Sequence, residues 1–413
     1  MKYSIAAFLA FVFVIFQHFQ VASIATYPVT IGLFAGILMI LIVSTRSSIV
    51  PITVTWSVIV GLGALSALVA PNYNDGTEFG QTLLLILLSS AVVVSGFYGR
   101  ATDFVRSAQF AKALFWALTV VVTLSMLQVV TGSLGSIALF NPFGANQYLY
   151  QYQPYLQFVA VPRAQGFYLE PSYDAFVIGT LTVCLLALGR NKIAASILCF
   201  LGLLACQSAT GLLLFAAIAI LIAVRAQPRV GVVVFVLLAA LVWLAGPSLT
   251  GRLESLGAAS SSANYRLVAP LEVMNTVLTA HPLGFPFGSI ADVMASYGLQ
   301  NGSTIGSSLD TGFYVIIFYF GWIGLFALVC WMVATAMYAL SRSRSGTGLV
   351  RIIPLWLFSC MFFSGGIVLP EFAISVWLAI SCMPLASETI GKLGLDRKTG
   401  TYTSPQHRDS YVQ

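Results

Sequence analysis

The chain has 413 residues, of which 59% are hydrophobic and 8% are charged, and its mean hydropathy is +0.93. Soluble domains carry about 25% charged residues, and this sequence repeatedly contains apolar runs of about 20 residues, the length that crosses a bilayer. The composition therefore excludes a water-soluble protein and predicts an all-α, polytopic membrane protein, whose net charge of +6 reflects loops at anionic lipid and does not indicate a nucleic-acid partner.

The apolar runs predict twelve transmembrane helices in chain order. Their ranges are 4–22, 28–44, 52–70, 82–99, 108–130, 172–189, 193–207, 209–225, 230–249, 311–340, 351–369 and 371–386. No linker or low-complexity block divides them, so residues 1–390 are interpreted as one membrane domain. The polar, aperiodic segment 391–413 predicts a cytoplasmic tail.

Basic residues set the predicted orientation. If every helix crosses once, 16 of the 19 Lys and Arg residues fall on one side, which the positive-inside rule makes cytoplasmic, together with both termini. The opposite side carries two long loops, 131–171 and 250–310, and loops of that length in a compact domain are usually functional. These loops contain the three remaining basic residues, Arg163, Arg252 and Arg266. Their position on the less basic face favours an anionic substrate.

The first long loop is rich in aromatic and amide side chains between Gln147 and Tyr168. Aromatic faces with amide partners suit sugar rings, which stack on them and need directed hydrogen bonds. An aromatic belt at the membrane interface explains the same residues equally well. Gln165 and Tyr168 are therefore candidate substrate-binding residues, and the belt remains the alternative.

This loop ends in Arg163-Ala164-Gln165-Gly166-Phe167-Tyr168-Leu169-Glu170-Pro171, immediately before a predicted membrane helix. The guanidinium of Arg163 offers a planar set of donors that matches phosphate oxygens. The carboxylate of Glu170 could accept a proton from a sugar hydroxyl. A salt bridge between Arg163 and Glu170 that only fixes the loop is the competing interpretation.

The second long loop contains Arg252 and the pair Tyr265-Arg266, followed by an apolar-periodic run. The run 267–279 predicts an amphipathic helix that lies on the surface and ends at His281-Pro282. Two or three arginines over one site could neutralise a pyrophosphate leaving group. Contact with lipid phosphates is the alternative for Arg252.

Acidic residues are few, and none of them lies deep in a predicted membrane helix. Ion-coupled carriers usually keep such residues there, so a transporter is less favoured. Asp75 and Glu78 are the nearest approach to a metal site, but two acids in a turn are too few to predict one.

Three patterns carry a resemblance to a known family. The first is Arg163-x-x-Gly166-x-x-x-Glu170-Pro171, the second is Gln207-Ser208-Ala209-Thr210-Gly211, and the third runs from Arg266 to His281-Pro282-Leu283-Gly284-Phe285-Pro286-Phe287-Gly288 and is followed by Gly321-Trp322-Ile323-Gly324. In this order and on these sides of the membrane, they resemble the O-antigen polymerase and ligase superfamily, and within it the Wzy-type polysaccharide polymerases.

The resemblance implies transfer of a growing glycan from undecaprenyl diphosphate to another lipid-linked repeat unit, at the periplasmic face of the bacterial inner membrane and without a cofactor or metal. Arg163 and Arg266 would hold the diphosphates, and Glu170 would activate or position the acceptor hydroxyl. Arg252 and Tyr265 are further substrate-binding candidates. Besides membrane lipid, a chain-length regulator protein is an expected partner.

Two other activities stay open. A ligase of the same fold would pass the glycan to a lipid or protein acceptor. Ligases similar to this family carry a His-Asn pair where this chain has Asp310-Thr311-Gly312, which favours the polymerase. A lipid-linked glycan flippase or exporter, from a different class, would need a charged central cavity, for which the predicted helices supply few residues.

Overall fold

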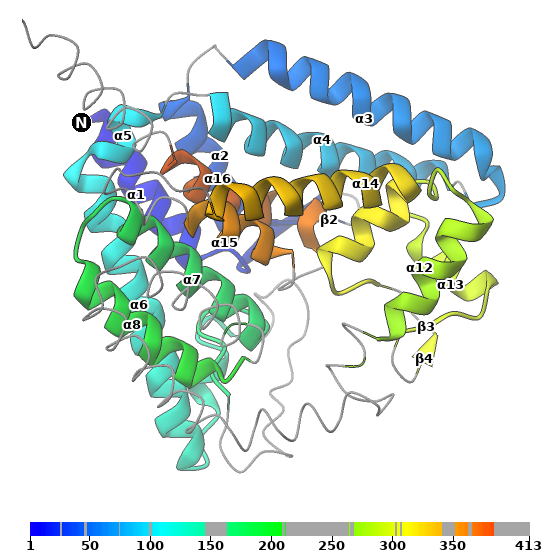
Figure 1. Ribbon diagram of the computed structural model, residues 1–413. Helices are drawn as coiled ribbons and strands as arrows, with labels where there is room; N and C mark the ends of the chain where they lie inside the picture. Colours follow the sequence, from blue (N-terminus) through cyan, green and yellow to red (C-terminus); the bar gives the residue numbers. More distant parts are fainter. Residues whose placement is uncertain are drawn as a thin grey trace, which may run out of the picture.

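The structure is a computed structural model that describes residues 1–24, 27–44, 48–73, 75–98, 101–144, 163–208, 211, 264, 268–301, 304–305, 308–340, 352–361 and 366–383. Within these ranges the chain is mainly helical, with two short antiparallel hairpins, β1–β2 and β3–β4 (Figure 1). The elements in chain order are α1 (Lys2–Ile15), β1 (Gln20–Ile24), β2 (Tyr27–Thr30), α2 (Ile31–Val43), α3 (Ile49–Val69), η2 (Pro71–Tyr73), α4 (Gly76–Tyr98), α5 (Thr102–Arg106), α6 (Ala108–Ser133), η3 (Ala138–Phe140), α7 (Pro171–Ala187), α8 (Lys192–Cys206), α12 (Ala269–Ala280), α13 (Ile290–Ser296), β3 (Gln300–Asn301), β4 (Thr304–Ile305), α14 (Gly312–Leu340), α15 (Ile352–Cys360), η8 (Gly366–Val368) and α16 (Pro370–Ser381).

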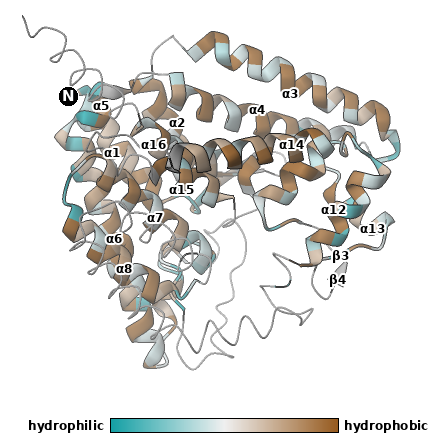
Figure 2. Cartoon of the chain, viewed as in Figure 1, coloured by the Kyte–Doolittle hydropathy of each residue, from teal (hydrophilic) through white to brown (hydrophobic). Residues whose placement is uncertain are grey.

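Four of the described helices are long and apolar enough to cross a membrane: α3, α4, α6 and α14. Hydrophobic residues cover much of α3, which lies at the edge of the molecule beside α4 (Figure 2). On α3 the side chains of Val50 and Leu68 are 72% and 78% exposed. Apolar surface of this kind is unfavourable in water but is well solvated by lipid tails. The fold is that of an α-helical membrane protein.

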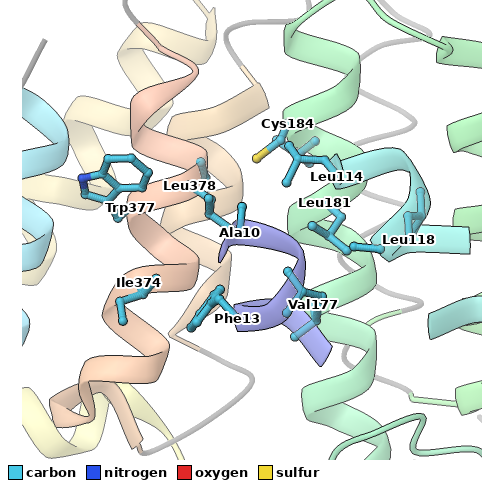
Figure 3. Close-up of a cluster of buried hydrophobic side chains, with 14 of the residues drawn as sticks. Ala10, Phe13, Leu114, Leu118, Val177, Leu181, Cys184, Ile374, Trp377 and Leu378 are labelled. Atoms are coloured by element: carbon cyan, nitrogen blue, oxygen red, sulfur yellow. The ribbon is translucent and has the colours of Figure 1, made fainter. Parts of the chain in front are cut away.

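The larger hydrophobic core holds the N-terminus of α7 in place. Figure 3 shows its centre, where side chains from α1, α6, α7 and α16 meet. Phe13 of α1 and Trp377 of α16 are completely buried there. Small residues allow the helices to approach closely, because a methyl group added at Gly36 of α2 would lie 2.6 Å from Ile374 of α16.

A second, smaller core joins α12, α13 and the first half of α14. Its buried side chains include Val273 and Val277 on one face of α12. The predicted amphipathic helix over 267–279 is therefore confirmed as a helix, α12, with an apolar face against α14. Phe285 and Phe318 stack in this core with ring centroids 5.3 Å apart.

The first predicted membrane helix, 4–22, is shorter than expected. Helix α1 ends at Ile15, and strand β1 begins only five residues later and pairs with β2. The polar residues Gln17 and His18 interrupt the apolar run at this point. They are buried nevertheless, and their side chains bond to the segment before and within α7.

Other predicted membrane helices are also interrupted in the described structure. Helix α14 (Gly312–Leu340) fills almost the whole predicted range 311–340 but is broken at Gly321, whose φ of 53° and ψ of −133° are not helical. The range 351–369 contains the nine-residue α15 and the short η8 instead of one continuous helix. The helices predicted at 209–225 and 230–249 lie outside the described residues, apart from Gly211.

Candidate functional site

Residues 163–170, called the 163–170 turn below, lead directly into α7. Pro171 occupies the first turn of the helix, where its fixed φ is compatible with helical structure and its missing N–H costs no hydrogen bond. The carbonyl of Glu170 accepts hydrogen bonds from the N–H groups of Tyr173 and Asp174, both at 3.1 Å. Gly166 has a φ of +56°, which only glycine adopts without strain. The local backbone structure thus explains why glycine stands at position 166 and why the Glu170-Pro171 pair opens α7.

Arg163 lies at the C-terminal end of α8. Its Nε donates a hydrogen bond to the carbonyl oxygen of Cys206 at 3.3 Å, and the neighbouring Ala164 N–H donates to the Ala205 carbonyl at 2.9 Å. These carbonyls form the negative end of the helix dipole, which favours a cation. The Arg163 side chain is half-buried, so part of it reaches the surface.

Glu170 lies at the other end of the turn, at the N-terminus of α7. Its side chain is half-buried, and Oε2 accepts a hydrogen bond from the Ser172 hydroxyl at 2.8 Å. Helices α7 and α8 pack together and are joined by a short turn, so the start of α7 and the end of α8 lie at the same end of the pair. This arrangement brings Arg163 and Glu170 to one end of the helix pair.

Gln128 of α6 forms the floor of the turn. Its Oε1 accepts hydrogen bonds from the N–H groups of Gln165 and Gly166, both at 2.9 Å. Its Nε2 donates to the carbonyls of Gly166 at 2.7 Å and Leu139 at 2.9 Å. One completely buried amide therefore holds the turn and also the start of the long loop that precedes it.

Asp174, in the first turn of α7, is a second buried polar group below the turn. Its Oδ2 accepts hydrogen bonds from the Ser125 hydroxyl at 2.7 Å and the Cys206 thiol at 3.1 Å. Its Oδ1 has no hydrogen-bond partner among the described residues, and a methyl group added at Gly166 would lie 2.8 Å from it. The carboxyl thus links α6, α7 and α8 immediately beneath Gly166.

Tyr168 and Gln165, both expected to bind substrate, face the protein interior. Neither side chain is exposed. The Tyr168 hydroxyl donates to the Val14 carbonyl at 2.8 Å, and Gln165 Nε2 donates to the Phe140 carbonyl at 2.8 Å. Burial, with a smaller effect of the charge on Asp174, raises the pKa of Tyr168 well above its usual value, so its hydroxyl stays protonated as a donor. This placement favours a role in holding the turn over direct contact with substrate.

His18 supports the last residues of the turn. Its Nδ1 accepts a hydrogen bond from the Leu169 N–H at 3.2 Å, and its ring lies 4.6 Å from that of Tyr173 between centroids. The Tyr173 hydroxyl donates to Oε1 of Gln17 at 2.9 Å. Of the two polar residues that follow α1, His18 therefore supports the backbone next to Glu170, and Gln17 holds the side chain of Tyr173.

Sequence reasoning did not single out Gln128, Asp174 or His18. Two signals were present in the chain. Gln128 is an amide within an apolar run, and Asp174 follows Glu170 by four residues, which places both acids on one face of a helix. Polar residues in or beside membrane helices are usually functional or satisfied by specific partners.

Three of the predicted site residues, Arg252, Tyr265 and Arg266, lie outside the described residues. Of the Gln207–Gly211 motif, the structure describes Gln207, Ser208 and Gly211. Gly211 donates its N–H to the Ser208 hydroxyl at 3.3 Å, and a methyl group added to Gly211 would lie 2.8 Å from Ala175 of α7. Gly211 at the end of this motif therefore packs against α7, the helix that follows the 163–170 turn.

The glycine-rich segment after α12 is joined to the break in α14. The N–H of Trp322 donates to the Pro282 carbonyl, and the N–H of Phe285 donates to the Phe318 carbonyl, both at 2.9 Å. A methyl group on Gly321 would overlap the Pro282 carbonyl oxygen. The two halves of the third motif are thus adjacent, and each supplies backbone partners that the other lacks.

Acidic and metal-ligating side chains do not gather in the described structure. Asp75 caps α4 by accepting hydrogen bonds from the N–H groups of Thr77 at 2.7 Å and Glu78 at 3.4 Å. Among the described residues, no group of three His, Cys, Asp or Glu side chains could hold a metal ion. Burial lowers the pKa of His281, which follows α12.

Comparisons with known proteins identify relatives over almost the whole chain. The family model described as WcaD colanic acid polymerase matches residues 5–384. A protein of Escherichia coli (strain K12), provisionally named as a colanic acid polymerase, is 23% identical over 371 residues, which cover 85% of this chain and 89% of the relative. No solved structure matches the chain.

Proposed function

The chain belongs to the WcaD colanic acid polymerase family, and from this premise we propose that it polymerises undecaprenyl-diphosphate-linked oligosaccharide repeat units at the periplasmic face of the bacterial inner membrane. The product would be colanic acid or a related polysaccharide. The observation that carries the proposal is the 163–170 turn, which presents a cation and a carboxylate at the same end of the packed helices α7 and α8. A donor diphosphate and an acceptor hydroxyl need these two groups.

In the proposed reaction a sugar hydroxyl of the acceptor unit attacks the anomeric carbon of the donor glycan. A new C–O bond forms, the bond between that carbon and the diphosphate oxygen breaks, and undecaprenyl diphosphate leaves with the electron pair. Glu170 takes the proton of the hydroxyl as general base or orients it. Arg163, together with Arg266 and Arg252 from the second long loop, would neutralise the negative charge that develops on the leaving diphosphate.

The surroundings of Arg163 support this role. Its Nε donates to the Cys206 carbonyl at the end of α8, and the side chain is half-buried, so part of it reaches the surface. Arginine stays charged at any working pH and binds phosphate oxygens through two parallel hydrogen bonds. The exposed apolar residues of α3 and α14 place the protein in lipid, which is where a lipid-linked substrate is found.

The first test is the polymer-length profile of a deletion strain that carries wild type, Arg163→Ala or Arg266→Ala. We expect wild type to restore long chains, and we expect each variant to leave single repeat units, because an unneutralised diphosphate is a poor leaving group. The amount of each variant in the membrane is the control. Long chains in the deletion strain without any complementing gene would contradict a polymerase and favour a ligase or an exporter.

Glu170 is tested separately with Glu170→Gln, which keeps the size of the side chain and removes its basicity. We expect polymerisation to fall by about 100-fold to 10,000-fold, the usual contribution of a general base. Synthesis from purified lipid-linked repeat units by the protein in detergent or nanodiscs measures it. Near-normal polymer from this variant would remove Glu170 from catalysis. Purification with and without a co-expressed chain-length regulator would test that partnership.

A further inference from the structure

Gln128 uses its whole hydrogen-bonding capacity on the long loop that carries the site. A glutamine amide offers two acceptor positions and two donors. All four are occupied, by two backbone N–H groups and two backbone carbonyls at 2.7 to 2.9 Å. Three of the four bonds go to Gln165 and Gly166, and the fourth goes to Leu139.

The pattern of these bonds closes the base of the loop. Leu139 lies at the start of the loop, whereas Gln165 and Gly166 lie at its end, immediately after Arg163. Gln165 strengthens the closure, since its Nε2 donates to the carbonyl of Phe140, beside Leu139. The segment between these two ends is therefore tied at its base to α6 by one side chain.

A leucine at position 128 would satisfy the needs of an apolar membrane helix. The amide is instead completely buried, and a buried amide is unfavourable unless it is fully bonded. We infer that Gln128 is a positioning residue for the proposed transfer reaction: it holds the 163–170 turn so that Arg163 and Glu170 reach the same donor and acceptor. This inference rests on the proposed function.

The test compares wild type with Gln128→Leu and Gln128→Asn in the extension of purified undecaprenyl-diphosphate-linked repeat units. Gln128→Leu removes all four bonds. Gln128→Asn keeps the amide group but shortens the side chain by one methylene. The polar group remains, but it no longer holds the 163–170 turn in its original position. Misplacement of reacting groups by about 1 Å can cost about 100-fold in rate, and we expect kcat per folded molecule to fall by about tenfold to 100-fold in both variants.

A matched control comes from the same helix. Within the part of the chain that the structure describes, the Thr119 hydroxyl donates to the Phe115 carbonyl, four residues earlier in α6, at 2.9 Å. Thr119→Val should therefore leave kcat and polymer length unchanged. The folded fraction of every variant is measured by thermal melting and by size-exclusion chromatography. A merely structural glutamine would lower the folded fraction and leave kcat per folded molecule intact, and this outcome would overturn the inference.

The failure of the inference is distinguishable from failure of the proposed function. If wild type extends the lipid-linked units, Arg163→Ala does not, and both Gln128 variants match wild type, the function stands and the positioning role is excluded. If folded wild type does not extend them at all, both proposals fall. If Gln128→Leu does not fold, Gln128→Asn decides, because it preserves the buried amide.

Discussion

The 163–170 turn and the break in α14 both interrupt regular structure, but different groups hold them in place. The turn rests on the buried amide of Gln128, which bonds to its backbone. Beneath Gly166 lies the buried carboxyl of Asp174, which bonds to the side chains of Ser125 and Cys206. The break in α14 rests mainly on backbone pairing, since the Pro282 carbonyl and the Phe285 N–H bond directly with residues of the helix. The Trp322 indole adds one side-chain bond, to the Leu278 carbonyl at 3.2 Å. At this break in α14, glycine contributes because it has no side chain, which lets the two backbone segments approach closely.

The difference has a chemical reason. Side chains can be arranged to present charged groups such as Arg163 and Glu170 in a defined geometry, and several helices can contribute to the arrangement. Backbone pairing at a helix break satisfies the N–H and C=O groups that the break releases, which is essential in lipid, where no water can replace them. The first region is therefore the better candidate for chemistry, and the second is a structural junction.

The largest expected effect is on the backbone junction. Gly321→Ala would place a methyl group on the Pro282 carbonyl oxygen and would force a residue with a side chain to adopt a φ of +53°. A φ of 53° combined with a ψ of −133° is a conformation that residues with a side chain rarely adopt, at a cost of about 1–3 kcal/mol. The overlap adds to this cost, so we expect α14 to lose its junction and the protein to be degraded or to melt early. Thermal melting in detergent and the amount in the membrane measure it.

Gly298→Ala is the matched control for this variant. Gly298 has a φ of +62°, but no atom of the described residues lies within 4 Å of the methyl group that the substitution would add. We therefore expect only the conformational cost, about 1–2 kcal/mol. Equal melting temperatures for the two variants would show that the contact with Pro282 contributes nothing.

The second prediction applies the same change to the side-chain region. Gly166→Ala would bring a methyl group to 2.8 Å from Oδ1 of Asp174, at a φ of +56°. Because the carboxyl belongs to a side chain and can shift, we expect a smaller loss of stability than at Gly321, about 2 kcal/mol, accompanied by a loss of polymer. Denaturation in detergent and the polymer-length profile test it. A larger loss of stability than at Gly321 would reverse the proposed order of the two regions.

The third prediction removes one donor from Asp174. Ser125→Ala should cost about 1–2 kcal/mol, because the buried carboxyl loses its 2.7 Å hydrogen bond. Of its two side-chain donors among the described residues, it keeps the weaker one, the thiol of Cys206. Ser133→Ala in the same helix is the control, since the Ser133 hydroxyl donates to the Val129 carbonyl of its own helix and is exposed. Similar melting temperatures for the two variants would mean that Asp174 does not depend on Ser125.

Many of the helices and the candidate site residues could be predicted from the sequence. The buried contacts that hold the 163–170 turn in place could not. The apolar runs predicted helices α3, α4 and α6 because a bilayer requires a minimum length, and the Glu-Pro pair predicted the start of α7. The sequence also singled out Arg163 and Glu170 as candidate site residues, because charged residues are rare in this chain, and their roles stay predictions. It could not predict that α1 ends at Ile15 or that Gly321 breaks α14, since both depend on contacts with segments far along the chain.

The roles of the buried residues were beyond the sequence for the same reason. The amide of Gln128 stands out within an apolar run, but its role is not visible in the sequence, because its partners lie 11 to 38 residues away. Tyr168 and Gln165 were expected to face substrate because aromatic and amide side chains suit sugars. Their burial follows from packing against α1 and η3, which the sequence alone does not reveal.

The smallest expected effect concerns Tyr168, and it separates a supporting role from a substrate-binding role. Tyr168→Phe removes only the hydroxyl that donates to the Val14 carbonyl at 2.8 Å, and the ring remains in the core. We expect a loss of about 1 kcal/mol in stability, the usual value of one buried hydrogen bond, and unchanged polymerisation per folded molecule. Thermal melting and extension of lipid-linked repeat units measure the two quantities. A strong loss of activity in a protein of normal stability would instead assign the hydroxyl to the substrate, and the buried position of Tyr168 would then have to change during the reaction.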